Sequence, residues 1–249
     1  MRMHSLAVAL LLACACAPSA GAQTAVLRPG DAVVRAETVG GGVQEFDLVE
    51  EDGSWEPVGR MVIRTRMVPV DGTPVIVRTE AIWMDDQLVQ VDSFTLDRRT
   101  LAPLALLSSS IETGVQLDFS PRHVRKVDNG DWGADTCDVA LPEPVFLGGT
   151  TDLLLGSLPL ATGYTAKLAV FDAQDGIDTI SVEVEAMEDV ALPEGGGVSA
   201  WRVAVTEGWL VSTYWMDRES RTLVQFESAD GSFRIVRSRG SRSRARPTR

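Results

Sequence analysis

The chain has few of the side chains that enzymes most often use as nucleophiles, general bases or metal ligands. Its 249 residues include 3 Cys and 2 His, and beyond residue 22 only Cys137 and His123 remain. A nucleophilic hydrolase needs a base beside its nucleophile, and no Gly-x-Ser-x-Gly elbow occurs. One Cys and one His also fall short of an ordinary zinc ligand set. We therefore predict a protein that is not an enzyme and uses no cofactor, with His123 exposed on a strand and Cys137 small and buried.

Positive charge is scarce in the body of the chain and dense at its C-terminal end. All 35 Asp and Glu lie between residues 23 and 233, where 15 Lys and Arg accompany them, so this stretch has a net charge of −20. An acidic body argues against nucleic acid as a partner. The Arg/Ser-rich tail, residues 237–249, is predicted to be disordered. It is either a solvated tail or a peripheral contact with an anionic envelope surface. The pattern does not indicate an oligomeric state.

The N-terminal residues read as an export signal. Arg2 precedes an apolar run from Leu6 to Ala17, and small residues from Ala20 to Ala22 suit cleavage after residue 22. We predict a signal peptide over residues 1–22 and a location in the periplasm. Alternatively, Leu11-Leu12-Ala13-Cys14 resembles a bacterial lipobox. Processing there would put a lipid on Cys14 and anchor the protein in the cell envelope.

Runs with long helical periodicity are scarce, and short alternating runs separated by turn signals fill most of the chain. This pattern is typical of a mainly β protein with an antiparallel sheet or an open barrel. We predict a single β-rich domain over residues 23–236. It comprises an N-terminal meander over 32–127, a loop and short helix over 128–160, and a C-terminal meander over 164–236. The first strand is expected from Ala32 to Thr38.

The middle segment holds the best helix candidate. Leu153 to Leu158 is short and apolar nearly all round, so the helix should be buried against the sheet. Thr151 or Asp152 could cap its N-terminus, and Pro159 would end it.

A polar, Gly-rich stretch before this helix, Asp128 to Asp135, is predicted to be a loop. Asp128, Asp131 and Asp135 cluster in it, followed by Asp138, and carboxylate oxygens are ligands that Ca²⁺ prefers. The spacing does not match an EF-hand loop. The stretch is therefore a weak candidate for a metal site, and a solvated acidic loop is the alternative.

Residues 209–226 read as a hairpin whose turn is Asp217 to Ser220. In its first strand Leu210, Ser212, Tyr214 and Met216 point one way, and Trp209, Val211, Thr213 and Trp215 point the other. Residues 94–101 resemble residues 214–223 if a two-residue gap is allowed. Either the two segments are related, or they share only the general pattern of a hairpin.

Several short motifs occur together in an order and spacing that resemble a known family. They are Thr151-Asp152, Leu158-Pro159-Leu160 with Gly163, Leu192-Pro193 with Gly195 to Gly197, Ala200-Trp201-Arg202-Val203, and Trp215-Met216-Asp217 with Arg221-Thr222-Leu223. The family is an uncharacterised exported bacterial one, "domain of unknown function 3108". The chain departs from its pattern at Thr222-Leu223-Val224, where a Leu-Pro step is usual.

The resemblance implies an antiparallel half-open barrel or strongly curved sheet with one short helix packed on the concave face. That architecture is similar to the periplasmic lipoprotein carriers of the LolA/LolB type. The resemblance implies no chemistry and no catalytic residues.

Aromatic residues in predicted strands suggest a concave apolar surface, although core packing would explain them equally simply. We predict a non-enzymatic envelope protein that binds a hydrophobic ligand such as a lipid or acyl chain. A structural or interaction module with a solid core is the alternative, and a carboxylate-based hydrolase is a third possibility. The candidate ligand-binding residues are Trp83, Trp201, Trp209, Tyr214, Trp215, Leu154 and Leu158.

Overall fold

The computed structural model describes residues 25–50, 56–111, 113–130, 133–193 and 195–238, and a single sheet of 16 strands runs through them. The strand order is β1-β11-β12-β13-β14-β15-β16-β2-β3-β4-β5-β6-β7-β8-β9, and β10 pairs separately with β11. Neighbours are antiparallel except β1 and β10, which both lie parallel to β11. The predicted export signal with Cys14, Asp131 and tail residues 239–249 lie outside the described residues.

The first half of the chain begins with β1 (Val26–Leu27) and the 3₁₀ helix η1 (Ala36–Thr38). An antiparallel meander follows, made of β2 (Gly42–Glu50), β3 (Pro57–Val70), β4 (Thr73–Met84), β5 (Gln87–Asp97), β6 (Pro103–Ser110), β7 (Gly114–Ser120), β8 (His123–Gly130) and β9 (Gly133–Ala140).

The second half holds the helix and a second meander. Its elements are β10 (Phe146–Leu147), the 3₁₀ helix η2 (Gly148–Thr150), α1 (Thr151–Ser157), β11 (Thr165–Asp172), β12 (Gly176–Ala191), β13 (Gly197–Glu207), β14 (Leu210–Asp217), β15 (Leu223–Glu227) and β16 (Phe233–Arg237). Pairing of β16 with β2 joins the two meanders into one sheet.

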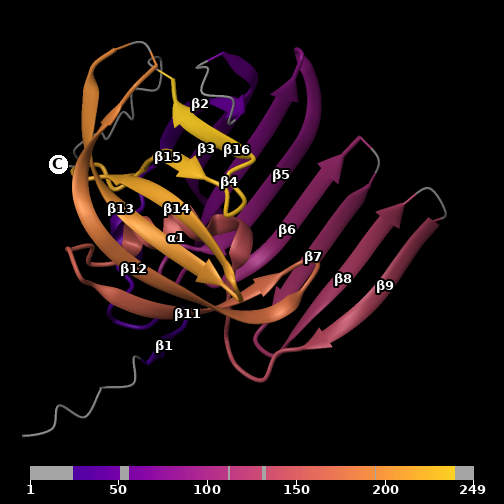
Figure 1. Ribbon diagram of the computed structural model, residues 1–249. Helices are drawn as coiled ribbons and strands as arrows, with labels where there is room; N and C mark the ends of the chain where they lie inside the picture. The colour runs from indigo at the N-terminus through magenta and orange to yellow at the C-terminus, as the bar shows by residue number, and fades with distance from the viewer. Residues whose placement is uncertain (1–24, 51–55, 112, 131–132, 194, 239–249) are drawn as a thin grey trace, which may run out of the picture.

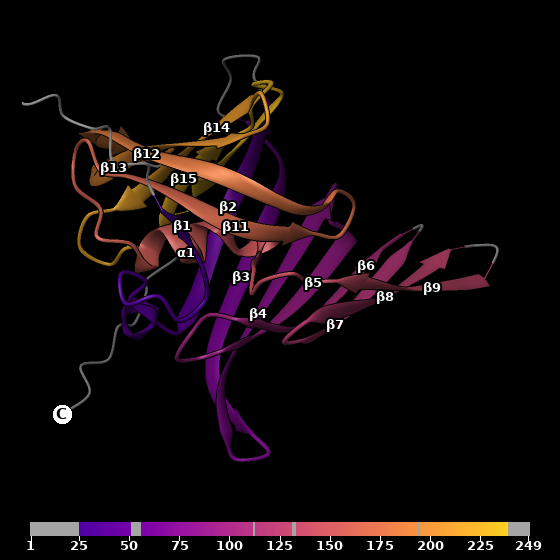
Figure 2. The ribbon, with the colours of Figure 1, turned by 90° about the horizontal axis from the view of Figure 1, so that it is seen from below.

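The sheet has a curved part and a flat part. Strands β11 to β16 and β2 to β5 curve around α1, whereas β6 to β9, here called the wing, extend away from them (Figures 1 and 2). The wing ends at β9, whose side chains are nearly all exposed. The fold is therefore the predicted half-open antiparallel architecture with one short helix on the concave face.

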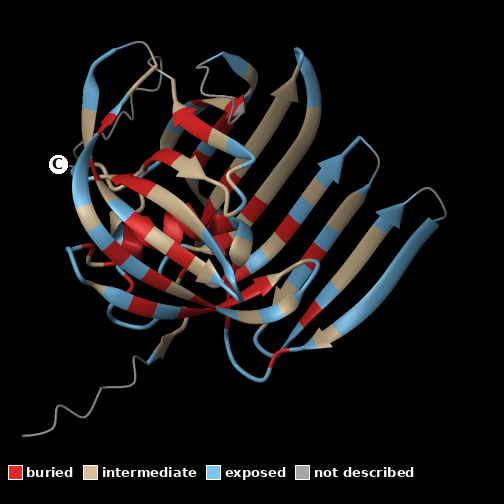
Figure 3. Cartoon of the chain, in the orientation of Figure 1, coloured by how far each residue is buried: buried red, intermediate tan, exposed pale blue. Residues whose placement is uncertain are grey.

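The helix α1 is held by burial. A helix of seven residues is far below the roughly 12–15 residues that an isolated helix needs in water. Leu154, Leu155 and Leu158 are no more than 1% exposed, and each fully buried leucine contributes about 1.5–3 kcal/mol. Figure 3 shows the buried residues gathered in the strands around this helix. The helix begins two residues earlier than predicted, and neither Thr151 nor Asp152 is its N-cap. The N-cap is Thr150, whose side chain makes no capping hydrogen bond in the described structure.

The similarity between residues 94–101 and the later hairpin is structural, and it needs no gap. Asp97 and Asp217 begin identical turns. In each, the aspartate Oδ1 accepts backbone N–H bonds of 2.8–2.9 Å from the residues two and three positions further on. The aspartate N–H donates to the carbonyl five positions further on, at 2.8 Å in both turns. Leu101 and Arg221 then take positive φ angles of 60° and 56°.

The strands that flank these two turns also correspond. A register shift follows each turn, so that Leu96 pairs with Pro103 and Met216 pairs with Leu223. In each turn the residue after the aspartate donates its backbone N–H to a carbonyl near the start of the strand that precedes the hairpin. Arg98 donates to Pro74 on β4 at 3.2 Å, and Arg218 donates to Ser199 on β13 at 3.0 Å. Strands β4-β5-β6 and β13-β14-β15 are thus two copies of one arrangement within the sheet.

The segment predicted as the first strand is not a strand. Within Ala32 to Thr38 the chain makes turns and the 3₁₀ helix η1, and Val34 and Ala36 pack into the core. The Arg35 N–H donates to the carbonyl of Ser157 at 2.9 Å. The last carbonyls of a helix lack partners within the helix. This segment therefore supplies a hydrogen-bond donor to the C-terminal end of α1 and does not pair in the sheet.

The predicted loop around Asp128 to Asp135 is a hairpin. Strands β8 and β9 pair up to Gly130 and Gly133, and Asp128 lies opposite Asp135. Its polar composition is that of strands that project into solvent at the end of the wing. Cys137 is exposed for the same reason, because β9 pairs only with β8 among the described strands, so the prediction of a buried thiol was wrong. His123 is exposed at the start of β8, as predicted.

Two further boundaries differ from prediction. Trp209 lies in the turn between β13 and β14 and is 87% exposed, because Glu207 pairs with Leu210 and leaves a two-residue turn. Arg237, assigned to the tail, is the last residue of β16 and forms an ion pair with Asp217 of 3.2 Å.

Candidate functional site

The seven predicted ligand-binding residues do not gather at one site. Leu154 and Leu158 are fully buried in the core around α1, and Trp201 and Tyr214 are packed against it. Tyr214 stacks edge-on against Phe226 at 4.8 Å between ring centres, and burial raises the pKa of its hydroxyl above the ordinary value. The curved half of the concave face is thus filled by the helix and by side chains.

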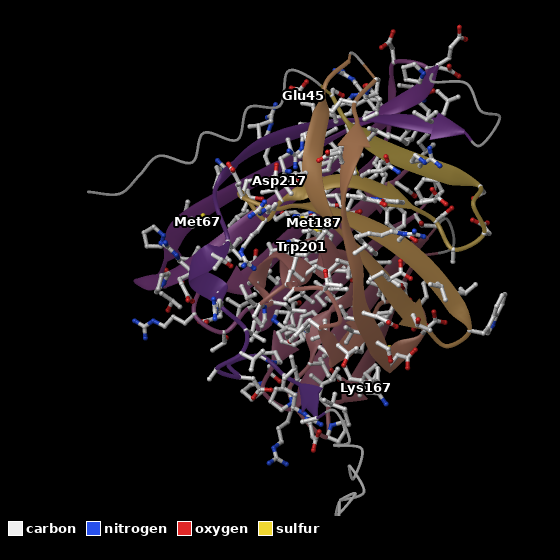
Figure 4. All side chains as sticks on the ribbon, turned by 60° about the vertical axis from the view of Figure 1, so that its left-hand side comes forward. Glu45, Met67, Lys167, Met187, Trp201 and Asp217 are labelled. Atoms are coloured by element: carbon white, nitrogen blue, oxygen red, sulfur yellow. The ribbon has the colours of Figure 1, made fainter. Side chains whose placement is uncertain are left out.

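The other predicted aromatic residues lie elsewhere. Trp215 belongs to a small buried cluster on the opposite face of the sheet, and its indole N–H donates to Glu188. Trp83 is half-buried with the Arg60 guanidinium 4.5 Å above its ring. Figure 4 shows Trp201 and Met187, which pair across β12 and β13. A role of the seven residues in ligand binding stays a prediction, and the cleft described next is lined by other residues.

A cleft of about 590 Å³ opens on the concave face, between the wing and the end of the β11–β12 hairpin. Strands β5 to β8 form one wall, and β10, η2 and the β11–β12 turn form the other. Its floor is apolar. The floor residues are Phe94, Leu106, Val115, Leu147 and Phe171.

The floor is held by a second core that joins the two ends of the sheet. Phe171 on β11 packs edge-on against Phe119 on β7, with 5.6 Å between ring centres. Leu117 and Val124 from the wing are fully buried in the same cluster. A Cβ at Gly149 would lie 3.0 Å from the Phe94 ring, so η2 approaches the floor closely at a residue without a side chain. The sheet therefore closes partly by side-chain packing, and the cleft lies beside this contact.

The wall formed by β5 to β8 also carries polar side chains, and one of them is Asp92 on β5. The amide Nε2 of Gln90 donates to Asp92 Oδ2 at 2.7 Å. Asp92 Oδ1 is buried and has no hydrogen-bond partner among the described residues. A buried carboxylate oxygen without a partner is costly, so a hydrogen-bond donor supplied by a ligand would stabilise it.

A single lysine crosses from the wing to the other wall. Lys126 Nζ donates to the Ala173 carbonyl at 2.7 Å and lies 3.1 Å from Asp128 Oδ2. This bridge ties β8 to the β11–β12 turn. It also satisfies most of the hydrogen-bonding capacity of the ammonium group, which has three donors.

A family model described as "Protein of unknown function (DUF3108)" matches residues 46–237, most of the chain. The chain belongs to the DUF3108 family. No curated protein matches it. A solved structure titled "Crystal Structure of Beta-barrel-like Protein of Domain of Unknown Function DUF1849 from Brucella abortus" is similar, with 12% identity and a TM-score of 0.47. That comparison covers 80% of this chain and 95% of the other.

The DUF3108 domain also contains a buried ion network between α1 and β4. Arg78 Nη2 donates to both carboxylate oxygens of Asp152 at 2.9 Å, and its Nε lies 2.5 Å from Glu80 Oε1. Burial acts to lower the pKa of Arg78, but Asp152 and Glu80 raise it above its ordinary value. Burial raises the pKa of Glu80, and the negative charge of Asp152 adds to this against the opposing effect of Arg78. The network fixes the helix to the sheet.

These acids do not form the paired carboxylates that a hydrolase would need. Glu80 and Asp152 are both engaged by Arg78, and neither lines the 590 Å³ cleft. Ser120 Oγ lies 2.7 Å from His123 Nδ1 at the β7–β8 turn, where Ser120 also donates to the His123 carbonyl. That contact closes an exposed turn. Nothing in the described residues of the DUF3108 domain positively indicates enzymatic chemistry.

The weak metal candidate is only partly described. Asp128 and Asp135 are cross-strand neighbours at the end of the wing, while Asp131 lies outside the described residues. Across the described ranges, no three His, Cys, Asp or Glu side chains gather in a way that could hold a metal ion. None of the described helices combines the length and apolar character that crossing a membrane requires.

Sequence reasoning missed the residues that line the cleft. Lys126 carried a signal, because it is one of two lysines between residues 23 and 233. Phe94 and Phe171 lie in strands that were predicted, but nothing in the sequence indicates that β11 folds over the wing. Tertiary packing alone brings them together.

Proposed function

We propose that this protein binds a small ligand with an apolar part in the cleft between the wing and the β11–β12 hairpin. The supporting observation is the cleft itself, open, concave, about 590 Å³ in volume and apolar at its floor. Ligand sites in proteins usually occupy about 300–1,000 Å³ and combine an apolar lining with a few polar groups. The protein acts as a binding protein and not as an enzyme.

The expected export signal extends this proposal to location. Processing after residue 22 would place the protein in the periplasm, and lipidation of Cys14 would anchor it in the cell envelope. An exported half-barrel with a concave apolar site suits a role in holding a lipid or acyl chain away from water, as LolA/LolB-type carriers do. The first residue of the mature protein, read by mass spectrometry, distinguishes the two forms of processing.

A matched pair of variants tests the cleft. Ser108 on β6 lines the cleft, and its neighbour Ser109 points to the exposed opposite face. Ser108→Trp fills the cleft, whereas Ser109→Trp adds the same side chain outside it. We expect the parent and Ser109→Trp to bind the uncharged fluorescent probe N-phenyl-1-naphthylamine saturably, and Ser108→Trp to lose most of that binding.

Both variants should have the same thermal unfolding midpoint as the parent, so that a loss of binding is not a loss of folding. Two results would then contradict the proposal. Equal binding by Ser108→Trp would place the probe elsewhere and remove the cleft from the proposal. Absence of saturable binding by the parent would favour the alternative, a structural or interaction module with no small ligand.

A further inference from the structure

The charges around the cleft indicate what kind of ligand it accepts. Among the described lining residues, three are carboxylates, Asp92, Asp128 and Asp172, and one is a cation, Lys126. Lys126 is already occupied by Asp128 and by the Ala173 carbonyl. An anionic head group would therefore meet an excess of negative charge and a lysine with little free capacity.

The three carboxylates are not equally available to a ligand. Asp172 Oδ1 accepts the backbone N–H of Gln174 at 2.7 Å, which fixes the β11–β12 turn. Asp128 is paired with Lys126. Asp92 is different, because Gln90 satisfies Oδ2 and orients the group, while the buried Oδ1 finds no hydrogen-bond partner within the part of the chain that the structure describes. The cleft thus presents one oriented carboxylate that lacks a donor.

The β11–β12 hairpin adds further negative charge to that of the lining residues. Asp175 and Asp178 lie in or next to its turn, close in sequence to Asp172. Burial raises the pKa of Glu207 on β13, and the negative charges of these three aspartates add to the effect. Such a field attracts cations and repels anions.

We propose that the ligand is an amphiphile whose head group carries a protonated amine, with the amine donating to Asp92 and the tail lying on the apolar floor. The proposal rests on the proposed function, since it names the ligand class for the same cleft. Amine-to-carboxylate hydrogen bonds are charge-assisted and stronger than neutral ones. The floor from Phe94 to Phe171 supplies the apolar contact that a tail needs.

The wing offers a closely matched control for Asp92. On the outer face of β7, Gln116 Nε2 donates to Asp118 Oδ2 at 3.0 Å, the same pairing two residues apart that Gln90 and Asp92 make inside the cleft. Asp118 is exposed and faces away from the cleft. Asp118→Asn therefore makes the same chemical change as Asp92→Asn without altering the cleft.

The test is displacement of N-phenyl-1-naphthylamine from the full chain at pH 7, below micelle-forming concentrations. Dodecylamine should displace the probe at about one-tenth of the concentration that dodecanoate requires, since one charge-assisted hydrogen bond is worth about tenfold or more in affinity. Asp92→Asn should remove most of this preference, and Asp118→Asn should keep it. Ethanolamine, an amine without a tail, should not compete.

The outcomes separate the two proposals. Saturable probe binding with dodecanoate equal to or better than dodecylamine would overturn the amine proposal and leave the cleft as a ligand site. Retention of the preference by Asp92→Asn would overturn the role of Asp92 in it. Competition by ethanolamine at dodecylamine concentrations would show that the tail is not bound. Absence of saturable probe binding would overturn both proposals.

Discussion

The buried ion network predicts a specific pattern of stability losses. The Arg78 side chain is 4% exposed, and Asp152→Ala removes its two 2.9 Å bonds to Asp152 while its ion pair with Glu80 stays. Removing one partner of a buried pair costs about 3–5 kcal/mol. Because Glu80 still pairs with the Arg78 Nε, we expect the lower end, about 3 kcal/mol.

An exposed ion pair in the same sheet supplies the comparison. Arg202 and Glu185 lie 3.0 Å apart with side chains 45% and 41% exposed. Solvent screens such pairs, so Glu185→Ala should cost less than about 1 kcal/mol. In thermal unfolding, a loss of 3 kcal/mol in a domain of this size lowers the midpoint by about 6–12 °C, and a loss below 1 kcal/mol by at most about 4 °C.

The assay is urea unfolding of the parent and both variants, followed by far-ultraviolet circular dichroism. A cost for Asp152→Ala no larger than that for Glu185→Ala would refute the view that the network is desolvated and holds α1. A third variant with Arg78→Met, Glu80→Leu and Asp152→Leu removes all three charges together. It should recover much of the stability lost by Asp152→Ala, because no unpaired charge remains buried.

Three further predictions concern single positions. Burial acts to raise the pKa of Asp217, but backbone N–H groups and Arg237 hold it below its ordinary value, so Asp217→Ala should cost roughly 2 kcal/mol at pH 7. A depressed pKa in the folded state stabilises above the unfolded pKa, so this difference should shrink as urea titrations are repeated below about pH 4, and a difference that grows there would contradict it. A Cβ at Gly156 would overlap the carbonyl oxygen of Arg221, so Gly156→Ala should cost about 1–3 kcal/mol, whereas Gly148→Ala, where the new Cβ meets ordinary contacts, should stay within about 1 kcal/mol of the parent; equal effects would contradict the close approach. Trp209→Ser removes an 87% exposed side chain and should change the unfolding free energy by less than about 0.5 kcal/mol, and a larger loss would show that Trp209 packs against the protein.

Local patterns predicted the strands better than they predicted contacts. The alternation in residues 210–216 predicted that Tyr214 and Met216 share one face of the strand and that Trp215 lies on the other, but it did not say which face is buried. In the structure Tyr214 and Met216 face the core around α1. The apolar run from Leu153 to Leu158 predicted a buried helix for the same reason, since an all-apolar helix has to be covered. These features depend on neighbours in sequence.

The predictions were wrong where contacts between segments far apart in the sequence determine the structure. Ala32 to Thr38 has strand composition, but its backbone serves the end of α1. Arg78 sits at a core-facing position of a strand, and its partner Asp152 is 74 residues away. The cleft depends on β11 packing against the wing, a contact that no pattern in either segment encodes.

The weak sequence similarity between residues 94–101 and 214–223 reflects a repeated structural arrangement. Asp97 and Asp217 are the visible residues of an arrangement that extends over three strands in each half of the sheet. The positive φ angles at Leu101 and Arg221 belong to non-glycine residues, so the sequence does not mark them as turn positions. The similarity looked gapped because the two turns share little beyond the aspartate.

The central claim, that a ligand lies in the cleft, is tested most directly by photo-crosslinking. A dodecylamine derivative with a diazirine near the end of its tail would be bound to the full chain, irradiated and mapped by mass spectrometry. We predict that labelling concentrates on β5, β6 and β11, at or next to Phe94, Leu106 and Phe171, and that Ser108→Trp abolishes it. Labelling at the exposed turn around Trp209, or labelling that Ser108→Trp leaves unchanged, would contradict the claim.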